Sequence, residues 1–562
     1  MNLLFDHFEK LIEAPDGIQK IRELILQLAV QGKLVPQDPN DEPASELLRK
    51  IKAEKLKLIS KSKIKKEKPL PPIRLEEIPN KLPKRWHLTN LINILLIMSN
   101  GYSGKQNKSK EGLPITRIET IANGKVDVDR IGYAELTERD INKYLIENGD
   151  ILFSHINSDE HLGKTAIFDM NITLYHGTNL LLLRTKPEIV NPKYINIYLQ
   201  YLRHSGYFKS IAKHAINQSS INQSALEKVR ILLPPLNEQH RIVAKVDQLM
   251  SLCGELEKLK EKRDHRQLQM NKAALFALLN SQTPEELAEH WQRIVDHFGE
   301  FYHTPENVAE LKKAILQLAV QGKLVSQDPN DEPASELLKK IKAEKQKFIV
   351  EGKIKKEKPL PPIKPEEIRY ELPKGWVSCR LGEVTNYGSS DKIEPKTIKN
   401  DTWVLELEDI EKGTSKLLKR ITNKYRQSKS TKSIFNKGDV LYGKLRPYLD
   451  KVLVAEENGV CTTEILPLRG YIDISPFYLR WYLKSPDFIE YANNSTQGVN
   501  LPRLGTEKGR DAIFLLPPFN EQLRIVAKVD KLMRLCDELE KGLTKSRESL
   551  GKALGSVVNG MS

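Results

Sequence analysis

Cysteine is scarce in this chain. Its 562 residues include four cysteines, Cys253, Cys379, Cys461 and Cys536, with no CxxC pair and no Cys/His cluster. This argues against a structural zinc site and fits a reducing compartment. Because Cys253 and Cys536 occupy equivalent positions at apolar helical spacing, we expect them to be small core residues.

Long apolar runs are missing as well. No stretch approaches the roughly 18 residues that a membrane-spanning helix needs. The N-terminal sequence MNLLFDHFEK is mixed and acidic, unlike a signal peptide. We therefore expect a cytoplasmic protein without membrane contact.

The short motifs of several enzyme classes are absent too. The sequence has no GxxxxGK[ST] nucleotide loop, no HExxH and no GxSxG. The Asn/Asp-Pro-Pro-aromatic tetrapeptide that adenine methyltransferases use is missing, as is a compact PD…ExK nuclease constellation. Composition alone leaves a dispersed nuclease site open. The sequence nevertheless predicts a binding protein with no catalytic site, no metal site and no bound cofactor.

Positive charge is in excess. Lys and Arg number 89 against 74 Asp and Glu, which gives a net charge of +15. Such a balance favours a polyanionic partner such as nucleic acid. The alternative is that the lysines only solvate helices. With 39% apolar residues, a chain of this length can form three or four domains with real cores.

The most informative feature is an internal repeat. Residues 25–55 (ILQLAVQGKLVPQDPNDEPASELLRKIKAEK) return 290 residues later at 315–345, with two of 31 positions changed. A second pair, LLPPLNEQHRIVAKVDQLMSLCGELE at 232–257 and LLPPFNEQLRIVAKVDKLMRLCDELE at 515–540, follows at an offset of 283. Two nearly constant frames therefore bracket two segments that differ.

Weak echoes connect the two variable segments. Gly149-Asp150-Ile151-Leu152-Phe153 aligns with Gly438-Asp439-Val440-Leu441-Tyr442, and Pro192, Tyr194 and Tyr198 align with Pro476, Tyr478 and Tyr482. Short β-rich runs such as ILFSHI and LLLLRT lie between turn residues. We expect both segments to share one mixed, β-rich fold with different loops.

The frames are predicted to be helical. Asn237 and Asn520 follow a Pro-Pro pair as N-caps, and Glu238 and Glu521 lie in the first turn, where the helix dipole favours negative charge. Apolar residues then recur at the 3-4 spacing of a coiled-coil seam. The alternative is a helix packed on a globular core. The seam residues are Val246, Leu249, Cys253, Leu256, Val529, Leu532, Cys536, Leu539 and Leu543.

The repeated segment 63–73 and 353–363 (KIKKEKPLPPI) joins lysines to a proline-rich stretch. Such a stretch favours extended polyproline conformation. We favour a solvated linker over a DNA or partner contact.

The order of the frames predicts a ring. The central frame carries a helix and then an arm, whereas the N-terminus has only an arm and the C-terminus only a helix. The last helix and the first arm together reproduce the central element, so the termini should lie close together. We therefore predict an α+β protein: two β-rich mixed domains joined by two long antiparallel helices, pseudo-twofold and circularly arranged. The predicted segments are an N-terminal arm (1–86), a variable domain (87–236), a central helix (237–282), a second arm and linker (283–376), a second variable domain (377–519) and a C-terminal helix (520–562).

These motifs give the chain a family resemblance. Two unlike segments that each end in LPP(L/F)NEQ(H/L)RIVAKVD, with a duplicated LAVQGKLV(P/S)QDPNDEPASELL block, closely resemble the specificity subunit of type I restriction–modification systems over essentially the whole chain. The resemblance implies two target-recognition domains that each read half of a bipartite double-stranded DNA site, with conserved helices that set the spacer. It also implies docking of two methyltransferase subunits, which bring S-adenosylmethionine, and association with restriction subunits, which use ATP and Mg. None of these cofactors is expected on this chain.

DNA readers need cations for phosphates, and amides, hydroxyls or arginines for base edges. For any one candidate, an ordinary surface or turn role is about equally expected. In the first domain the candidates are Lys105, Lys108, Arg117, Asn123, Lys125, His155, Asn157, Lys164, His176, Thr178, Asn179, Gln218, Ser219 and Asn222. In the second they are Tyr387, Ser389, Ser390, Lys392, Lys444, Arg446, Tyr448, Thr462, Thr463, Gln497, Asn500 and Arg503.

Two other functions stay open from the sequence. One is a stand-alone DNA-binding regulator or non-enzymatic scaffold that uses the helices to dimerise. The other, a single-chain methyltransferase or nuclease, is disfavoured by the missing motifs.

Overall fold

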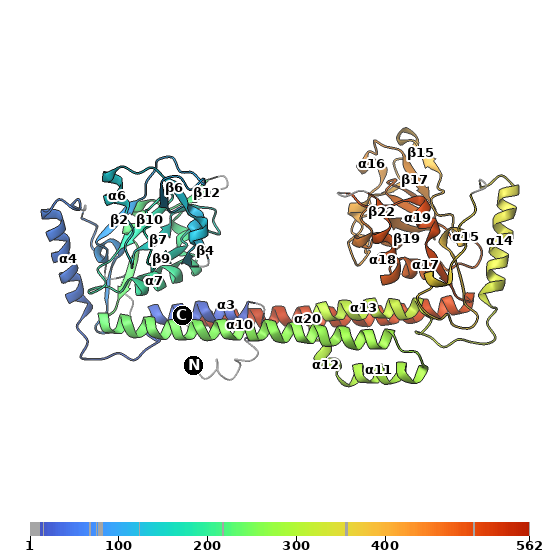
Figure 1. Cartoon of the computed structure of the whole chain (residues 1–562), viewed down its shortest axis with the longest axis horizontal. Coiled ribbons are helices and arrows are strands. Elements are labelled where there is room, and N and C mark those ends of the chain that lie inside the picture. Colours follow the sequence, from blue (N-terminus) through green and yellow to red (C-terminus); the bar gives the residue numbers. More distant parts are fainter. Residues whose placement is uncertain are drawn as a thin grey trace. The chain divides into compact units, whose positions relative to one another are not determined.

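The structure is a computed structural model, shown in Figure 1. It describes residues 12–14, 16–66, 69–74, 76, 82–122, 124–215, 218–354, 358–497 and 501–560. The chain divides into two compact units: unit 1 is residues 1–262 with 547–562, and unit 2 is residues 263–546. The divisions fall inside two long helices, α10 (Leu236–Leu279) and α20 (Phe519–Gly560). Across the described residues, every helix is too short or too polar to cross a membrane.

The described residues of unit 1 form the arm helices α3 (Gly17–Val30) and α4 (Ala44–Ser60) and a mixed domain. Its other helices are α5 (Leu91–Ile94), α6 (Glu138–Tyr144), α7 (Pro192–His204), α8 (Tyr207–Ile211) and α9 (Gln223–Glu227), with the short 3-10 turns η2 (Ile118–Thr120) and η3 (Val128–Arg130). Its strands are β1 (His87–Asn90), β2 (Ile97–Asn100), β3 (Leu113–Ile115), β4 (Ile121–Ala122), β5 (Lys125–Val126), β6 (Gly132–Ala134), β7 (Ile151–Ser154), β8 (Ile156–Asn157), β9 (Thr165–Ile167), β10 (Leu180–Arg184), β11 (Lys213–Ala215), β12 (Gln218–Ser220) and β13 (Arg230–Leu233).

Unit 2 repeats this plan after a helical connector. The connector is α11 (Pro284–Asp296) and α12 (Phe298–Phe301), and the arm is α13 (Pro305–Val320) and α14 (Ala334–Val350). The remaining helices are α15 (Leu381–Val384), α16 (Asn423–Arg426), α17 (Pro476–Leu483), α18 (Pro486–Asn494) and α19 (Thr506–Asp511), with 3-10 turns η4 (Pro365–Glu367), η5 (Pro395–Thr397), η6 (Leu407–Asp409) and η7 (Pro447–Leu449). The strands are β14 (Val377–Arg380), β15 (Lys392–Ile393), β16 (Trp403–Leu405), β17 (Lys432–Phe435), β18 (Val440–Gly443), β19 (Val452–Val454), β20 (Gly459–Cys461), β21 (Ile465–Leu468), β22 (Thr496–Gln497), β23 (Arg503–Leu504) and β24 (Ile513–Leu516).

Each mixed domain, here called a variable domain, is closed by its own first and last strands. In unit 1, β1 pairs antiparallel with β13, so that His87 faces Leu233. In unit 2, β14 pairs with β24, so that Val377 faces Leu516. The chain therefore enters and leaves each variable domain through one ladder, next to the start of a long helix.

The cores of the variable domains are mixed sheets, which confirms the α+β class. The main sheet of unit 1 has the order β2-β10-β7-β9-β5-β4, in which β5 and β9 are parallel and the other pairs antiparallel. Strand β7 is buried along its whole length. Unit 2 divides its strands between a β15-β17-β20-β16 sheet and a β19-β18-β21 sheet.

Helix α7 packs against β9 in unit 1, and α17 packs against β18 and β19 in unit 2. Asn191 and Ser475 cap α7 and α17 through their side chains, and a proline follows at the first helical position. The aligned tyrosines of the two helices make equivalent hydrogen bonds. Tyr194 Oη donates to Leu232 O at 2.7 Å, and Tyr478 Oη donates to Leu515 O at 2.9 Å. The predicted correspondence of these residues is confirmed.

The predicted seam residues lie on packed faces, but the sequence did not predict what faces them. In unit 1, Val246 and Cys253 are buried in one core with Ile21 and Ile25 of arm helix α3. In unit 2, Cys536 shares a core with Leu311 and Ile315 of arm helix α13 and with the end of α10. Figure 1 shows α3 running along α10 and α13 along α20. The arm helices thus contribute to the helical packing. The seam residues pack in these two cores and in the core of the second variable domain, which includes Val529.

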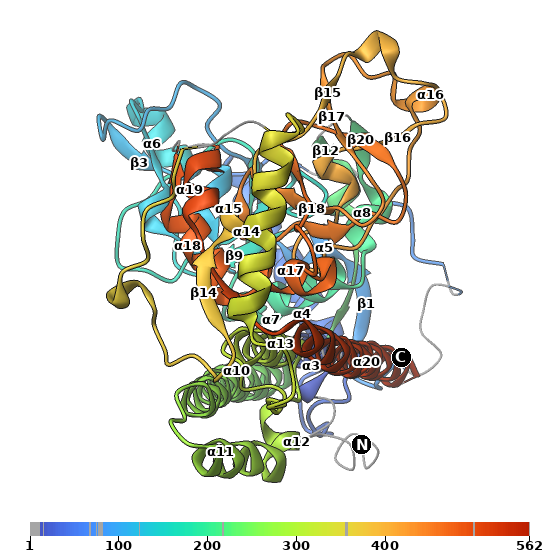
Figure 2. The same ribbon diagram turned by 90° about the vertical axis from the view of Figure 1, so that its right-hand side faces the viewer.

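Helix α14 stands against the second variable domain, beside α15 (Figure 2). The proline-rich segment that follows it packs on that domain, where the Arg380 guanidinium donates to Pro361 O and Pro362 O, both at 3.1 Å. The corresponding residue of unit 1 is Asn90, which accepts a hydrogen bond from Arg230. The same linker sequence is thus anchored by an arginine in unit 2 that unit 1 lacks.

Candidate nucleic-acid interface

Predicted residues of unit 1 gather at one edge of the main sheet. Because Leu180 faces Ser154 and Leu181 faces Asn100, strands β2 and β7 end where β10 begins. Residues 155–157 and 176–179 therefore leave the sheet together. We call residues 155–157, 176–179 and 218–220 the first edge.

A hairpin completes the first edge. Strand β12 pairs with β8, so that Ser219 faces Asn157, and Ile221 N donates to His155 O at 2.8 Å. Ser219 is buried, and its Oγ donates to Asp159. Residues about 60 positions apart in the sequence thus meet, as a shared site requires.

The two histidines of the first edge are not cations near neutral pH. Burial lowers the pKa of His155 and of His176 to about 4. His176 Nε2 lies 3.3 Å from Ser99 O, and the Nδ1 atom of each ring has no hydrogen-bond partner among the residues the structure describes. Both rings are buried, with His155 8% and His176 1% exposed, so the predicted contact of these two side chains with a base edge is not available in this conformation. As neutral rings they also do not neutralise phosphates.

Acid should therefore weaken unit 1. Unfolded His176 takes up a proton near pH 6.5, but the folded ring does so only near pH 4. The unfolded state binds more protons in this window, so stability is full above pH 6.5 and falls toward pH 4, by at most about 3 kcal/mol for this residue. Urea unfolding followed by hydrogen exchange of β2 and β10 at pH 7.5 and 5 measures the loss. His176→Asn should reduce it, and an equal acid loss in that variant would contradict the assignment.

Cations flank the first edge. Lys105 and Lys108 are exposed on a loop that is fixed by Asn107 N, which donates to Tyr133 O at 2.8 Å. A Cβ placed on Gly177 would lie 2.9 Å from Gln106 Nε2, so this loop lies against residues 176–179. Ser154 N donates to Lys164 O at 2.8 Å, which brings Lys164 to the same edge.

Unit 2 builds the corresponding edge. Gly443 faces Ile465, Lys444 N donates to Glu464 O at 3.0 Å, and Leu504 N donates to Lys444 O at 3.1 Å. We call residues 444–448, 462–464 and 503–504 the second edge. It contains the predicted Lys444, Arg446, Tyr448, Thr462, Thr463 and Arg503.

Other predicted residues lie elsewhere. The prediction of Tyr387 as a surface reader was wrong, since its side chain is 1% exposed in the core beneath Gly509 of α19. Lys125 lines a pocket with Val246 and Asp247 of α10, at the opposite end of the sheet from His155.

Several remaining candidates are partly engaged within the protein. Asn222 caps α9 by accepting from Ala225 N at 2.8 Å, and Arg117 pairs with Glu119 at 2.9 Å. Lys392 Nζ donates to Ser433 Oγ at 2.7 Å, next to Ser390, and Ser389 is exposed. Asn123 and Asn500 lie outside the described residues, as do the side chains of Gln218 and Gln497.

Comparison with known proteins fits this two-domain arrangement. The family model described as "Type I restriction modification DNA specificity domain" matches residues 83–263 and 373–547. The chain is 37% identical over 540 residues to the type I restriction enzyme EcoAI specificity subunit of Escherichia coli, covering 93% of this chain and 90% of that protein. The chain belongs to the type I restriction–modification specificity subunits. It is a DNA sequence-specificity subunit and a non-catalytic component of such a system.

A second curated specificity subunit and one solved structure are also similar to this chain. The EcoEI specificity subunit of Escherichia coli is 34% identical over 553 residues, covering 95% of this chain and 92% of that protein. A solved HsdS subunit from Thermoanaerobacter tengcongensis shares 16% identity with a TM-score of 0.40, and the match covers 86% of this chain and 98% of that one.

In this specificity subunit, the NEQ(H/L)R motif forms a polar clamp that the sequence did not reveal. We use the term clamp for Glu238, Gln239 and Arg241 and their counterparts Glu521, Gln522 and Arg524. Gln239 is fully buried; its Oε1 accepts from Asn191 N at 2.8 Å and its Nε2 donates to Pro234 O at 2.9 Å. Gln522 repeats this with Ser475 N at 2.9 Å and Pro517 O at 3.2 Å.

The clamp also holds the duplicated block. Arg241 pairs with buried Asp41 at 2.7 Å and Arg524 pairs with Asp331 at 2.6 Å. The Trp86 indole donates to Glu238 Oε2 at 3.0 Å. One motif therefore fastens a long helix to its arm and to its variable domain in each unit. These contacts give the repeated aspartate of the DPNDEP segment, Asp41 and Asp331, the same role in both units.

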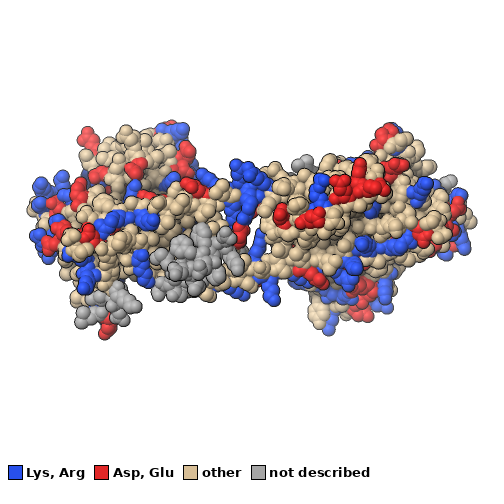
Figure 3. All heavy atoms as spheres, turned by 90° about the horizontal axis from the view of Figure 1, so that it is seen from below, with Lys and Arg blue, Asp and Glu red and all other residues tan. Residues whose placement is uncertain are grey.

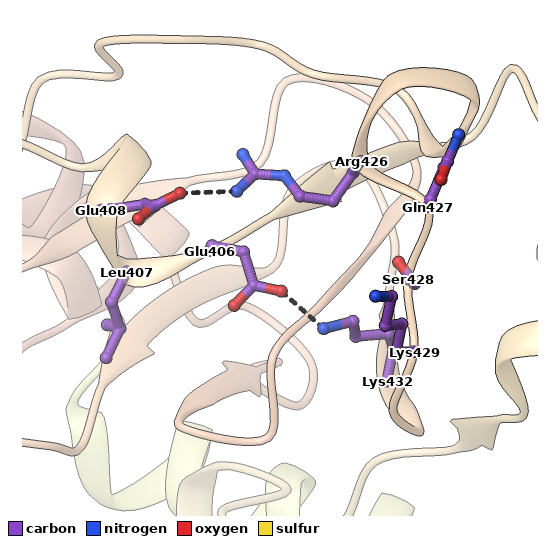
Figure 4. A pocket seen from close by; sticks show the side chains of 8 residues that line it. All are labelled: Glu406, Leu407, Glu408, Arg426, Gln427, Ser428, Lys429 and Lys432. Atoms are coloured by element: carbon purple, nitrogen blue, oxygen red, sulfur yellow. Dashed lines mark hydrogen bonds and ion pairs between the residues drawn. The ribbon is translucent and has the colours of Figure 1, made fainter.

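A pocket in unit 2 was also missed. It measures about 550 Å³ and is lined by residues 406–408, 426–429 and 432. Figure 4 shows Lys432 pointing to Glu406 and Arg426 pointing to Glu408. The Lys432 Nζ to Glu406 Oε1 distance is 2.5 Å, and the Arg426 Nη1 to Glu408 Oε1 distance is 2.9 Å. No local pattern marks this pocket, because its acids and its cations come from two separate segments.

Charges of both signs are mixed on one face of the specificity subunit. On the face shown in Figure 3, lysine and arginine side chains interleave with aspartate and glutamate. The excess of positive charge therefore does not identify an interface on this face. The two edges are identified by strand geometry instead.

Proposed function

We propose that each variable domain reads one half of a bipartite double-stranded DNA site through its edge. One observation carries this proposal. The two edges follow equivalent strands of the two domains yet differ in sequence, with His155-Ile156-Asn157 in one and Lys444-Leu445-Arg446 in the other. Two half-sites of different sequence require different side chains at equivalent positions of a common fold.

We further propose a pseudo-twofold arrangement in which α10 and α20 run antiparallel as a coiled coil and set the spacer. In support, both units repeat an ion pair between arm and long helix, Arg22–Glu257 at 2.7 Å and Lys312–Glu540 at 2.5 Å. Within unit 1, Lys20 Nζ donates to Gly551 O at 2.8 Å, so the C-terminal helix meets the first arm. At about 1.5 Å per residue, the 44 residues of α10 extend about 66 Å, nearly two turns of B-DNA.

The same proposal covers the partners. Two methyltransferase subunits would dock on the repeated helical frames and bring S-adenosylmethionine, and restriction subunits would bring ATP and Mg. A frame that is nearly identical in two copies suits a partner bound twice. None of these cofactors is assigned to this chain.

Methylome sequencing tests the proposal. Cells that express this chain with its partner methyltransferase should show adenine methylation at one bipartite motif with a fixed spacer. Cells that express the methyltransferase alone should not. A methylome without such a motif, together with DNA binding by the isolated chain, would favour a stand-alone regulator and overturn the proposal.

A further inference from the structure

Arg446 has an unfavourable backbone conformation on the second edge. Its φ of 53° and ψ of 66° lie in the left-handed region, which residues with a Cβ adopt at a cost. It also precedes Pro447, and a proline restricts the preceding residue toward extended conformations. Arginine is therefore a poor choice for the backbone of this position.

The surrounding fold imposes this conformation. Arg446 N donates to Pro502 O at 2.8 Å, and Leu449 N donates to Arg446 O at 2.9 Å. The adjacent Leu445 bridges Arg503. Glycine could satisfy the same backbone bonds with less strain. The presence of arginine is thus explained by its side chain.

Two other left-handed residues of this domain, Asp450 and Ser415, have internal roles that Arg446 lacks. Asp450, with φ of 49°, pairs with Lys484 at 2.6 Å. Ser415, with φ of 59°, donates to Asp450 O at 2.7 Å and accepts from Val452 N at 3.0 Å. Arg446 is exposed, and its guanidinium makes no hydrogen bond or ion pair with any residue that the structure describes.

The neighbouring arginine is already engaged. Arg503 pairs with Glu464 at 3.0 Å, which neutralises that guanidinium and fixes its direction. Arg446 therefore presents, at the tip of the edge, five donors that no described residue uses. Strain kept at an exposed, unpaired residue is typical of functional positions.

We propose that Arg446 is a base-reading residue of the second variable domain and donates two hydrogen bonds to O6 and N7 of a guanine in the major groove. The planar fork of arginine matches these two acceptors, and no other base presents this pair. This inference rests on the proposed function, because it assigns one position of the half-site that the second edge reads.

The test uses the complex of this chain with its methyltransferase and the variant Arg446→Gly. We expect cognate DNA affinity to fall roughly 5- to 150-fold. Methylome sequencing should show that one guanine of one half-site becomes degenerate, while the other half-site is unchanged. Affinity for unrelated DNA and its salt dependence should stay nearly constant. Arg446→Lys keeps the charge but loses the fork, so part of the discrimination should be lost as well.

Asp473→Gly is the matched control. Asp473 is exposed and left-handed, with φ of 54°, but it lies in the turn before α17 at the clamp of the same unit. Both glycine variants should keep or raise the melting temperature, since both relieve strain. Only Arg446→Gly should alter the motif.

Three outcomes would overturn the inference while leaving the proposed function intact. These are an unchanged motif in Arg446→Gly, a uniform loss on all DNA with a salt slope smaller by about one, or a lower melting temperature, which would show a structural role. If the wild-type complex yields no bipartite motif, the proposed function fails first, and this result is distinguishable from the other three.

Discussion

Replacing Lys484 by methionine is expected to destabilise unit 2 by about 3–5 kcal/mol. Lys484 is 6% exposed, and its ammonium contacts Asp450 Oδ2 at 2.6 Å, Ser415 Oγ at 2.8 Å and Gly413 O at 3.0 Å. Burial raises the pKa of Asp450 and lowers that of Lys484, so each charged form is destabilised by burial and depends on the other charge for stabilisation. Methionine fills similar space but leaves the carboxylate buried without its cation.

Hydrogen exchange read by mass spectrometry can assign this loss to one unit. Protection should fall in segments 411–418 and 444–451, which the Lys484 network joins and which include Arg446. The double variant Lys484→Met with Asp450→Asn should recover much of the stability, because no charge is then left unpaired. Gln200 occupies the corresponding position of α7 in unit 1 and is half-buried, so Gln200→Met should cost less than about 1 kcal/mol. A Lys484→Met chain as stable as wild type would show that water reaches Asp450.

Local sequence patterns predicted those features that depend on neighbouring residues. The Pro-Pro-x-Asn pattern located the starts of the long helices, which begin at Leu236 and Phe519. The predicted N-caps Asn237 and Asn520 were wrong, because each is the second residue of its helix. The echo at Gly149 and Gly438 identified equivalent strands, and the polar residues after them converge in both units. Alignment of the chain with itself was sufficient, because strand ends and caps are set by short-range chemistry.

Features that depend on distant residues were not predicted. Tyr387 lies in the polar stretch NYGSS and looks like a surface tip, but Gly509, more than 100 residues later, leaves room for its ring in the core. The role of Gln239 was not predicted, because its partner Asn191 is placed by the fold of the variable domain. The packing of arm helices α3 and α13 on the seam was not predicted for the same reason. A heptad pattern shows that a helix has an apolar face, but not which helix packs against that face.

Alanine substitution of the clamp glutamines should have large and matched effects. Gln239→Ala is expected to destabilise unit 1, and Gln522→Ala unit 2, by about 2–4 kcal/mol each. Each change leaves a buried main-chain N–H and a buried carbonyl without partners, at roughly 1–3 kcal/mol per group. Urea unfolding of the two variants, with exchange of β13 and β24 as local reporters, gives both values. Gln248→Ala, at an exposed site of α10, should change stability by less than about 0.5 kcal/mol.

The equality of the two losses is the informative part of this prediction. Each clamp glutamine contacts main-chain atoms of its variable domain, Asn191 N and Pro234 O in unit 1 and Ser475 N and Pro517 O in unit 2. The residue at the first contact differs between units, yet the bond is the same. A clamp that binds main-chain groups holds its domain whatever side chains that domain carries. If Gln239→Ala destabilised its unit and Gln522→Ala did not, the two clamps would differ in strength. The sequence differences between the edges could then not be separated from differences between the frames.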